Sequence, residues 1–258
     1  MASPSELFDI SGRTALITGS SRGIGRAFAE ALLRAGCTVV LNGRDEQRLR
    51  ETRRTLPREL VAASHAVAFD NSDPAAVTAG IAHAERLAGP IDILVSNTGA
   101  QQRAPLTDFS DADWYRLLET NLSSAFLVGR EVARRMVPRG GGKIINVCSL
   151  QSEVARAGIA PYAATKGALK MLTKGMCADL AGSGIQVNGI GPGYIATELT
   201  AALVADEQFS AWVRGRTPAG RWGTVADLVG ALIFLCSPAA DFVNGQILYV
   251  DGGMLAVL

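Results

Sequence analysis

The chain has few of the features that mark metalloproteins, secreted proteins or membrane proteins. It contains only two histidines, and its four cysteines (Cys37, Cys148, Cys177 and Cys236) are widely separated, which argues against a zinc site or a disulfide framework. Residues 1–13 include no apolar run of signal-peptide length, and the longest apolar run, 228–236, is too short to span a bilayer. We therefore predict a soluble, cytoplasmic protein without a bound metal, whose cysteines are buried apolar side chains.

The chain also lacks an excess of charge of either sign. With 25 Lys and Arg against 24 Asp and Glu, its formal net charge is +1, so we expect neither nucleic acid nor a membrane as a partner. Any anion site must be local. At 258 residues the chain has a length common for a single α/β domain, and we predict one domain over 1–258.

Short apolar runs alternate with longer helical patterns along the chain. Because the runs are continuously apolar, they are typical of strands that are covered on both faces by helices. We predict a doubly wound, seven-stranded parallel α/β sheet, with strands at 14–18, 38–42, 65–69, 91–96, 143–148, 185–190 and 246–250. Two long helices are predicted at 111–137, capped by Ser110, and at 161–181. The segment 196–222 breaks this rhythm, and we expect it to fold over the sheet edge.

The first predicted strand ends in the glycine-rich segment TGSSRGIGR. Glycines at 19, 23 and 25 let the backbone turn tightly and approach a pyrophosphate, whose charge is met by the N-terminus of the next helix. Because the segment follows a strand and precedes a helix, it predicts a dinucleotide site, with contacts from Gly19, Ser21, Arg22, Gly23, Ile24 and Gly25.

The residues after the second strand favour NADP(H). NAD enzymes commonly place an acid there for the ribose, whereas NADP enzymes place an arginine near the 2′-phosphate. Arg44 occupies this position, and Arg22 can reach the same phosphate, so two guanidiniums could form bidentate bonds to it. Asp45 as the ribose acid, and solvated arginines without a ligand, are the alternatives.

A tyrosine and a lysine lie four residues apart in the second long helix. Tyr162 and Lys166 therefore share one helix face. The pKa of a free phenol is about 10, and we expect the neighbouring ammonium to lower the pKa of Tyr162, so that it exchanges a proton with an alcohol or carbonyl oxygen. A half-buried ring beside a surface lysine is the alternative for a lone pair of this kind.

Two further polar residues fit the same chemistry. Ser149 follows the predicted strand at 143–148, where its hydroxyl can hydrogen-bond a substrate oxygen opposite Tyr162. Asn121 lies inside a long helix, a position its side chain does not favour, and its amide can hold a water that connects Lys166 to solvent. Taken singly, the two residues also fit a turn serine and a solvated asparagine.

Together, the glycine-rich loop, Asn121, Ser149, Tyr162-x-x-x-Lys166 and GPG at 191–193 resemble the short-chain dehydrogenase/reductases, over about 7–258. The resemblance implies a Rossmann fold with Tyr162 as acid/base and Ser149 as carbonyl polariser. It makes Asn121 the water anchor, while Lys166 tunes Tyr162 and binds the nicotinamide ribose. It also implies a homotetramer, in which the terminal VNGQILYVDGG segment commonly packs between subunits, and cofactor contacts from Asp70, Asn71, Asn97, Gly99, Pro192, Gly193, Ile195 and Thr197. Thr98 departs from the family's alanine and should crowd the cofactor's sugar slightly.

Segments outside these motifs, at 101–106, 149–176 and 216–223, resemble the branch of the family that interconverts D-gluconate and 5-dehydro-D-gluconate with NADP(H). A sugar acid needs a cation for its carboxylate and polar partners for its hydroxyls. We expect Arg103 to bind the carboxylate, and Gln151 or Glu153 the hydroxyls. Loop charges in water are the alternative for each.

Two other functions stay open. A 3-oxoacyl-[acyl-carrier-protein] reductase shares the fold, the cofactor and the catalytic groups, and its acidic carrier would need a basic patch beside the cleft. Arg134, Arg135 and Arg139 could supply that patch, or simply form a solvated helix end. A non-catalytic NADP-sensing protein is the less favoured alternative, because it has no need for a complete set of Asn, Ser, Tyr and Lys.

Overall fold

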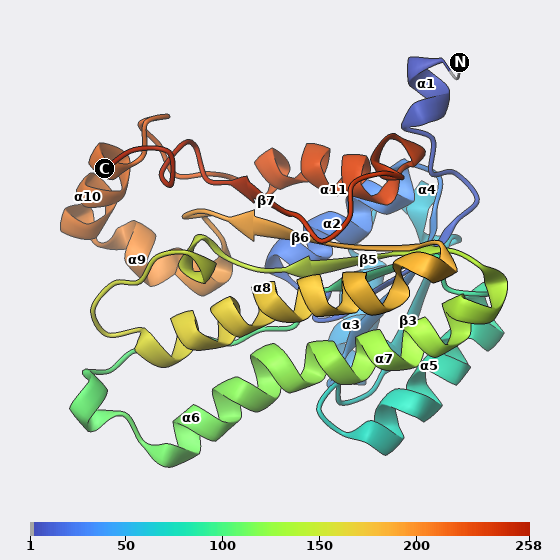
Figure 1. Cartoon of the computed structure of the whole chain (residues 1–258), viewed down its shortest axis with the longest axis horizontal. Coiled ribbons are helices and arrows are strands. Elements are labelled where there is room, and N and C mark those ends of the chain that lie inside the picture. Colours follow the sequence, from blue (N-terminus) through green and yellow to red (C-terminus); the bar gives the residue numbers. More distant parts are fainter. Residues whose placement is uncertain (1–2) are drawn as a thin grey trace.

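Seven parallel strands form one sheet in the order β3-β2-β1-β4-β5-β6-β7, in a computed structural model that describes residues 3–258 (Figure 1). The order reverses between β1 and β4, and every neighbouring pair is parallel. This topology confirms the predicted sheet. The strands are β1 (Thr14–Ile17), β2 (Thr38–Gly43), β3 (Ser64–Ala68), β4 (Ile93–Ser96), β5 (Gly142–Val147), β6 (Ile185–Pro192) and β7 (Ile247–Val250).

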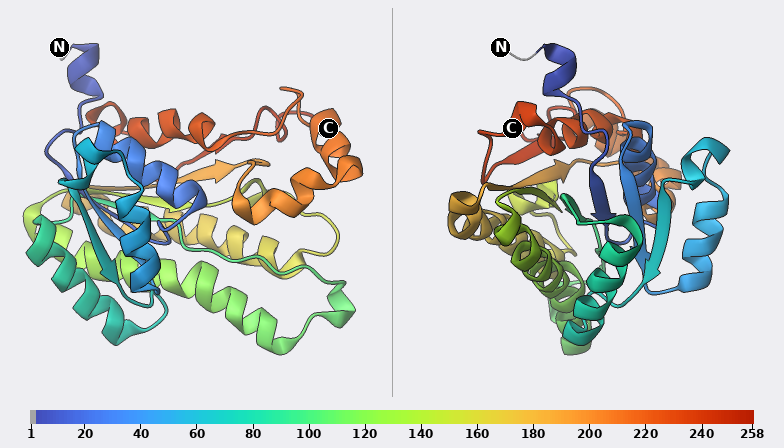
Figure 2. Two further views of the ribbon diagram at one scale, coloured as in Figure 1. Left: turned by 180° about the vertical axis from the view of Figure 1, so that it is seen from behind. Right: turned by 90° about the vertical axis from the view of Figure 1, so that its right-hand side faces the viewer.

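Helices cover both faces of the sheet (Figure 2). The α-helices are α1 (Pro4–Leu7), α2 (Gly23–Arg34), α3 (Glu46–Arg54), α4 (Arg58–Val61), α5 (Pro74–Ala88), α6 (Asp111–Leu118), α7 (Ser124–Met136), α8 (Ala160–Leu180), α9 (Ala201–Ala205), α10 (Glu207–Arg216) and α11 (Val229–Cys236). Short 3₁₀ turns are η1 (Leu106–Asp108), η3 (Val137–Arg139), η4 (Leu150–Ser152), η5 (Ala181–Ser183), η6 (Glu198–Thr200), η7 (Val225–Leu228) and η8 (Pro238–Ala240). Within residues 3–258, no helix combines the length and the apolar character needed to cross a membrane.

Strand β1 shows why the apolar runs are continuous. Ala15, Leu16 and Ile17 are all fully buried, and successive side chains of a strand point to opposite faces. Ala15 and Ile17 join the core that packs against α2 and α11, whereas Leu16 joins the core against α5 and α7. Each face thus has its own apolar layer, and burying a side chain of this size stabilises the fold by about 1.5–3 kcal/mol.

The predicted helix at 111–137 contains an irregular turn. Ser110 caps α6 by accepting a hydrogen bond from the Asp113 amide, as predicted. Between α6 and α7 the chain forms one π-helical turn, Glu119–Ser123, that contains Asn121. Such turns occur frequently at functional sites. The turn accommodates an asparagine that an ordinary helix interior disfavours.

Helices α9 and α10 lie within the segment 196–222, and they lie together beside the carboxyl end of β6 (Figure 1). Phe209 and Trp212 of α10 pack with Tyr194 and Trp222, and the contacting ring centroids are 5.4–6.3 Å apart. Such aromatic pairs add to the stabilisation that burial gives. The cluster anchors α10 to the body of the protein.

The four cysteines are free thiols. Cys37, Cys148 and Cys236 are buried, as predicted, and Cys177 is half-buried. Burial raises the pKa of Cys37 and of Cys148 to about 11 in each case. They therefore act as apolar core residues at neutral pH.

Candidate active site

A cavity of about 500 Å³ opens at the carboxyl edge of the sheet. Ligands of open α/β sheets bind at this edge, where the strand order reverses. The cavity brings together most of the predicted site residues: Gly19, Ser21, Arg22, Gly23, Ile24, Arg44, Asp70, Asn71, Asn97, Gly99, Arg103, Ser149, Gln151, Tyr162, Lys166, Pro192, Gly193, Ile195 and Thr197. Gly25, Asn121 and Glu153 do not line it.

The glycine-rich loop has the shape of a phosphate cradle. Gly19 and Gly23 adopt left-handed backbone angles, with φ of 61° and 55°, which favour glycine. A Cβ on Gly25 would lie 2.4 Å from Asn97 Nδ2 and 2.5 Å from the Gly19 carbonyl oxygen. Asn97 Nδ2 in turn donates to the carbonyls of Thr18 and Gly19. Gly25 and Asn97 therefore shape the loop, while no atom lies within 4 Å of a Cβ placed on Gly23.

Two free guanidiniums flank this loop. Arg22 and Arg44 are exposed, line the cavity and form no ion pair within residues 3–258. Asp45, the alternative ribose ligand, instead caps α3 by accepting from the Arg48 amide at 3.0 Å, and it does not line the cavity. The geometry therefore favours a cation pair over an acid at this position.

Polar side chains after β3 and β4 are linked to one another. Asn71 Nδ2 donates to Thr98 Oγ1 at 2.9 Å and to Asn42 Oδ1 at 3.0 Å. Asp70 accepts from the backbone and the hydroxyl of Ser72, and the Ser72 hydroxyl is the main reason that the pKa of Asp70 is lowered. Thr98, the departure from the family's alanine, thus ties two loops of the cavity together.

Lys166 is buried beside Tyr162 on α8. Its Nζ donates to the Val147 carbonyl at 2.7 Å and lies 5.9 Å from the centroid of the Tyr162 ring. Burial lowers the pKa of Lys166 to about 8, because desolvation disfavours the ammonium. Lys166 is therefore near its titration point in the neutral range.

The pKa of Tyr162 is shifted in the opposite direction to our expectation. Desolvation of the hydroxyl raises the pKa of Tyr162, and a hydrogen bond with Ser149 only partly offsets this effect. The predicted lowering by Lys166 is wrong for this structure, because burial of the phenol dominates the shift, and the Lys166 ammonium is directed to the Val147 carbonyl. Tyr162 therefore keeps its proton at neutral pH.

Ser149 lies at the end of β5 and caps η4. Its hydroxyl donates to Gln151 Oε1 and accepts from the Gln151 amide, and it is close enough to Tyr162 for a hydrogen bond. Ser149 is only 5 % exposed, so its position is fixed by the strand end. Ser149 and Tyr162 thus present two hydroxyls to the same point of the cavity.

Asn121 is fully buried, and its side chain is almost fully hydrogen-bonded. Nδ2 donates to the Ala100 carbonyl and to Thr165 Oγ1, each at 3.0 Å, while Oδ1 accepts from the Ala100 amide at 2.7 Å. Both N–H donors are therefore used, and only a lone pair of Oδ1 is left for a water. A Cβ on Gly99 would lie 3.5 Å from this oxygen and 3.8 Å from Lys166 Nζ, so the two polar atoms border the same space.

The predicted substrate residues separate into two groups. Arg103 and Gln151 line the cavity, and the Arg103 guanidinium donates to Gln101 Oε1 at 2.7 Å. Glu153 does not line it, which corrects our expectation that it contacts substrate. Its Oε1 accepts instead from Lys170 Nζ at 2.5 Å and from the Tyr249 hydroxyl at 2.7 Å.

The cavity residues that the sequence analysis missed include an arginine and a tyrosine. Arg156 and Tyr194 line the cavity next to Arg103. Loss of water lowers the pKa of Arg103, and the charge of Arg156 lowers it further. A second arginine seven residues after Ser149, in the loop before α8, was the signal that could have identified Arg156.

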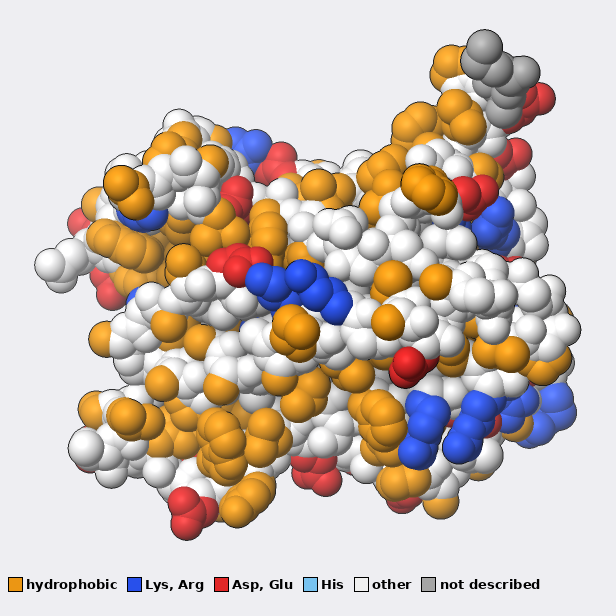
Figure 3. All heavy atoms as spheres, viewed as in Figure 1, with side chains coloured by type: hydrophobic (Ala, Val, Ile, Leu, Met, Phe, Trp, Pro, Cys, Tyr) orange, Lys and Arg blue, Asp and Glu red, His pale blue; other side chains and the backbone are white. Residues whose placement is uncertain are grey.

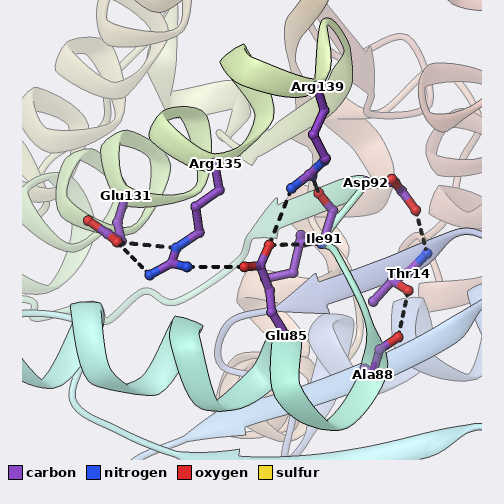
Figure 4. A network of polar contacts seen from close by, with 8 residues as sticks. All are labelled: Thr14, Glu85, Ala88, Ile91, Asp92, Glu131, Arg135 and Arg139. Carbon is purple, nitrogen blue, oxygen red and sulfur yellow. Dashed lines mark hydrogen bonds and ion pairs between the residues drawn. The ribbon is translucent and has the colours of Figure 1, made fainter.

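The three arginines that could have formed a carrier-protein patch lie elsewhere and are paired. Glu85 contacts Arg135 at 3.1 Å and Arg139 at 3.4 Å, and Glu131 contacts Arg135 at 3.0 Å (Figure 4). Glu131 also contacts Arg134 at 3.5 Å. Arg139 also donates to the carbonyl of Ile91, just before β4. These residues therefore occupy the amino edge of the sheet, opposite the cavity, and provide no basic patch beside it.

Comparisons with known proteins agree with this geometry. A family model described as enoyl-(acyl carrier protein) reductase matches residues 19–255. The chain is 56 % identical to gluconate 5-dehydrogenase of Gluconobacter oxydans (strain 621H), with 98 % of each chain covered. It is 47 % identical to 5-keto-D-gluconate 5-reductase of Escherichia coli (strain K12), covering 98 % of this chain and 99 % of that one. A gluconate 5-dehydrogenase from Burkholderia cenocepacia J2315, solved with NADP and tartrate, is 54 % identical with a TM-score of 0.94, covering 98 % and 99 % of the two chains.

Proposed function

Because the chain belongs to the short-chain dehydrogenase/reductase family, we propose that it is an NADP(H)-dependent oxidoreductase that interconverts D-gluconate and 5-dehydro-D-gluconate. One observation carries this proposal. The Ser149 and Tyr162 hydroxyls, the Arg103 guanidinium and the glycine-rich loop all border a single cavity. Relatives named for this reaction match the chain over nearly its whole length.

The residues at the glycine-rich loop fit NADP(H). The left-handed Gly19 and Gly23 and the open space at Gly23 leave room for a pyrophosphate. Arg22 and Arg44, which form no ion pair within residues 3–258, suit a 2′-phosphate. When bound, NADPH supplies the hydride that the reduction requires. The proposed cofactor contacts are Gly19, Ser21, Arg22, Gly23, Ile24, Gly25, Arg44, Asp70, Asn71, Asn97, Gly99, Tyr162, Lys166, Pro192, Gly193, Ile195 and Thr197.

Tyr162 acts as the proton donor in the reductive direction. Its raised pKa keeps the phenol protonated at neutral pH, which is the state that gives a proton to a ketone oxygen. When substrate is bound, the Ser149 hydroxyl turns from Gln151 Oε1 and donates a hydrogen bond to the same oxygen, where it stabilises the developing charge. Lys166 supplies positive charge beside the phenol, and the free lone pair of Asn121 Oδ1 holds a water that returns a proton.

The substrate carboxylate binds Arg103, and Gln151 binds a hydroxyl. A charged partner for Arg103 compensates a guanidinium that lies partly out of water. Arg103 and Tyr162 line the same cavity. A substrate whose C1 carboxylate binds Arg103 is therefore proposed to place its C5 ketone at the hydroxyls of Ser149 and Tyr162. The segment 196–222 covers the substrate, and Leu199, Thr200 and Leu203 from this segment line the cavity.

The test is a substrate and cofactor panel. Absorbance of NADPH and of NADH is followed with 5-dehydro-D-gluconate, an acetoacetyl thioester and simple ketones. We expect the highest kcat/KM with NADPH and 5-dehydro-D-gluconate. A preference for the thioester would replace the proposal with a carrier-protein reductase, and a preference for NADH would remove Arg22 and Arg44 from the account.

We also propose that the chain forms a homotetramer in the cytoplasm. Hydrophobic side chains gather over the face formed by α6, α7 and α8 (Figure 3), and those of Tyr115, Phe126 and Met171 are exposed. On β7, Leu248 is exposed as well. Light scattering after size-exclusion chromatography should give four times the 27.0 kDa chain mass, and fractionation of cells should recover the activity with the cytoplasm.

A further inference from the structure

Arg156 is a half-buried cation whose Nε has no hydrogen-bond partner within residues 3–258. It lies between η4 and α8, and its Nε is buried and makes no hydrogen bond within residues 3–258. Its Nη1 makes only a long contact of 3.4 Å with the Ala157 carbonyl. Buried donors are nearly always hydrogen-bonded in folded proteins. Arg156 lines the cavity, so an acceptor atom of a bound ligand could satisfy this free donor.

The surroundings of Arg156 accumulate positive charge. Arg103 lies close enough for each charge to disfavour the other, and neither residue has an acidic partner within residues 3–258. Of the two acids that line the cavity, Asp70 bonds Ser72 and Glu198 pairs with neither arginine. The Tyr194 hydroxyl is within hydrogen-bonding reach of Arg156. This end of the cavity thus lacks an anion of its own.

The position of Arg156 is also fixed. Its guanidinium carbon lies 5.3 Å from the centroid of the Phe209 ring on α10, a geometry that holds a cation by its attraction to the ring face. Phe209 belongs to the aromatic cluster that anchors α10. This contact leaves the buried Nε without an acceptor within residues 3–258, and a guanidinium can bind a carboxylate in bidentate fashion.

We propose that Arg156 is a specificity-determining residue, which together with Arg103 clamps the substrate carboxylate and selects open-chain hydroxy acids over neutral sugars. The inference rests on the proposed function, and it extends that function by a second cation. A carboxylate between the two guanidiniums removes their mutual repulsion and satisfies the buried Nε. A neutral substrate offers no such compensation and leaves both charges unpaired.

The test compares an acid with its neutral isostere. The substrates are 5-dehydro-D-gluconate and its C1 amide, and the variants are Arg156→Met, Arg156→Lys and Arg130→Met. Arg130 is the matched control, because its guanidinium also lies over a ring, that of Phe126 on α7, at 4.9 Å. Loss of a charge-assisted bond predicts that Arg156→Met lowers kcat/KM for the acid by about 10- to 100-fold, mainly through KM. For the amide, the same variant should change kcat/KM by less than about 3-fold.

Binding supplies a second readout that does not depend on turnover. Calorimetric titration of tartrate into the chain with NADP⁺ should show affinity weakened by about 10- to 100-fold in Arg156→Met and by less in Arg156→Lys. Arg130→Met should match the wild type. NADP⁺ affinity, measured in the same variants, should be unchanged.

Several outcomes overturn the proposal. These are equal losses for the acid and the amide, unchanged tartrate affinity in Arg156→Met, no tartrate binding by the wild type, or a parallel loss of NADP⁺ affinity, which would indicate a structural role. If the wild type reduces neither substrate, the proposed function fails, and the tartrate titration still decides whether Arg156 binds a carboxylate.

Discussion

Arginines at the two edges of the sheet occupy opposite electrostatic settings. At the amino edge, Arg135 and Arg139 are held by Glu85, and Glu131 adds a second acid (Figure 4). At the carboxyl edge, Arg103 and Arg156 line a cavity and have no acidic partner within residues 3–258. The sequence shows the same residue type in both places. The difference teaches that an uncompensated charge, and not a cluster of charges, marks the place where we propose that this protein binds an anion.

The largest effect should come from Tyr162→Phe at the carboxyl edge. This change removes the proton donor and little volume, so kcat should fall by about 10²- to 10⁴-fold, while NADPH affinity stays within about 3-fold of the wild type, since the phenol is not a charged cofactor contact. Turnover is measured by NADPH absorbance and affinity by NADPH fluorescence. Substantial residual turnover would remove Tyr162 from its assigned role.

Arg103→Met should break the carboxyl-edge site less severely. Loss of a charge-assisted contact made in ground state and transition state alike should raise KM for 5-dehydro-D-gluconate by about 10- to 100-fold with a small change in kcat. Arg135→Met at the amino edge is the matched control and should leave both constants unchanged. Steady-state kinetics decide the matter, and an unchanged KM in Arg103→Met would contradict the carboxylate assignment.

A smaller effect is expected from pH. The pKa of Lys166 is lowered to about 8 by burial, so its ammonium is present below this pH and is lost as the pH rises through it. Tyr162, whose pKa is raised, stays protonated over this range. Because only the positive charge of Lys166 is lost, reductive kcat should fall several-fold above about pH 8. Lys166→Arg, whose guanidinium keeps its charge, should abolish this step. A profile that is flat through this pH in the wild type would show that the charge of Lys166 does not matter.

The smallest effect on catalysis should come from Glu85→Gln. This change leaves the partly buried Arg139 without a carboxylate and Arg135 with Glu131 alone, and the free energy of unfolding should drop by about 1–3 kcal/mol. Kinetic constants should stay at wild-type values, because the network lies at the edge opposite the cavity. Denaturant unfolding and NADPH absorbance are the two measurements. Altered KM with unaltered stability would show that the two edges are not independent.

The sequence was sufficient for the sheet because its signal is local. Strands such as Thr14–Ile17 are buried on both faces. Their continuously apolar sequence is enough to predict this burial. The glycine-rich loop and the four-residue spacing of Tyr162 and Lys166 are equally local, and the structure brings both to one cavity.

The rest depended on three-dimensional surroundings. Glu153 and Arg156 lie three residues apart in one loop, yet Glu153 bonds Lys170 and Tyr249 while Arg156 lines the cavity. No periodicity distinguishes such neighbours. The direction of the pKa shift of Tyr162 was likewise hidden, because desolvation depends on packing from distant segments. The π-helical turn at Asn121 was visible only as an asparagine in an unfavourable helix position.

The most direct measurement is a crystal structure of the chain with NADP⁺ and D-gluconate. The account predicts that the carboxylate lies between Arg103 and Arg156, and that the C5 hydroxyl lies within hydrogen-bonding distance of both Tyr162 and Ser149. A carboxylate bound away from these arginines, or a C5 hydroxyl remote from Tyr162, would contradict it.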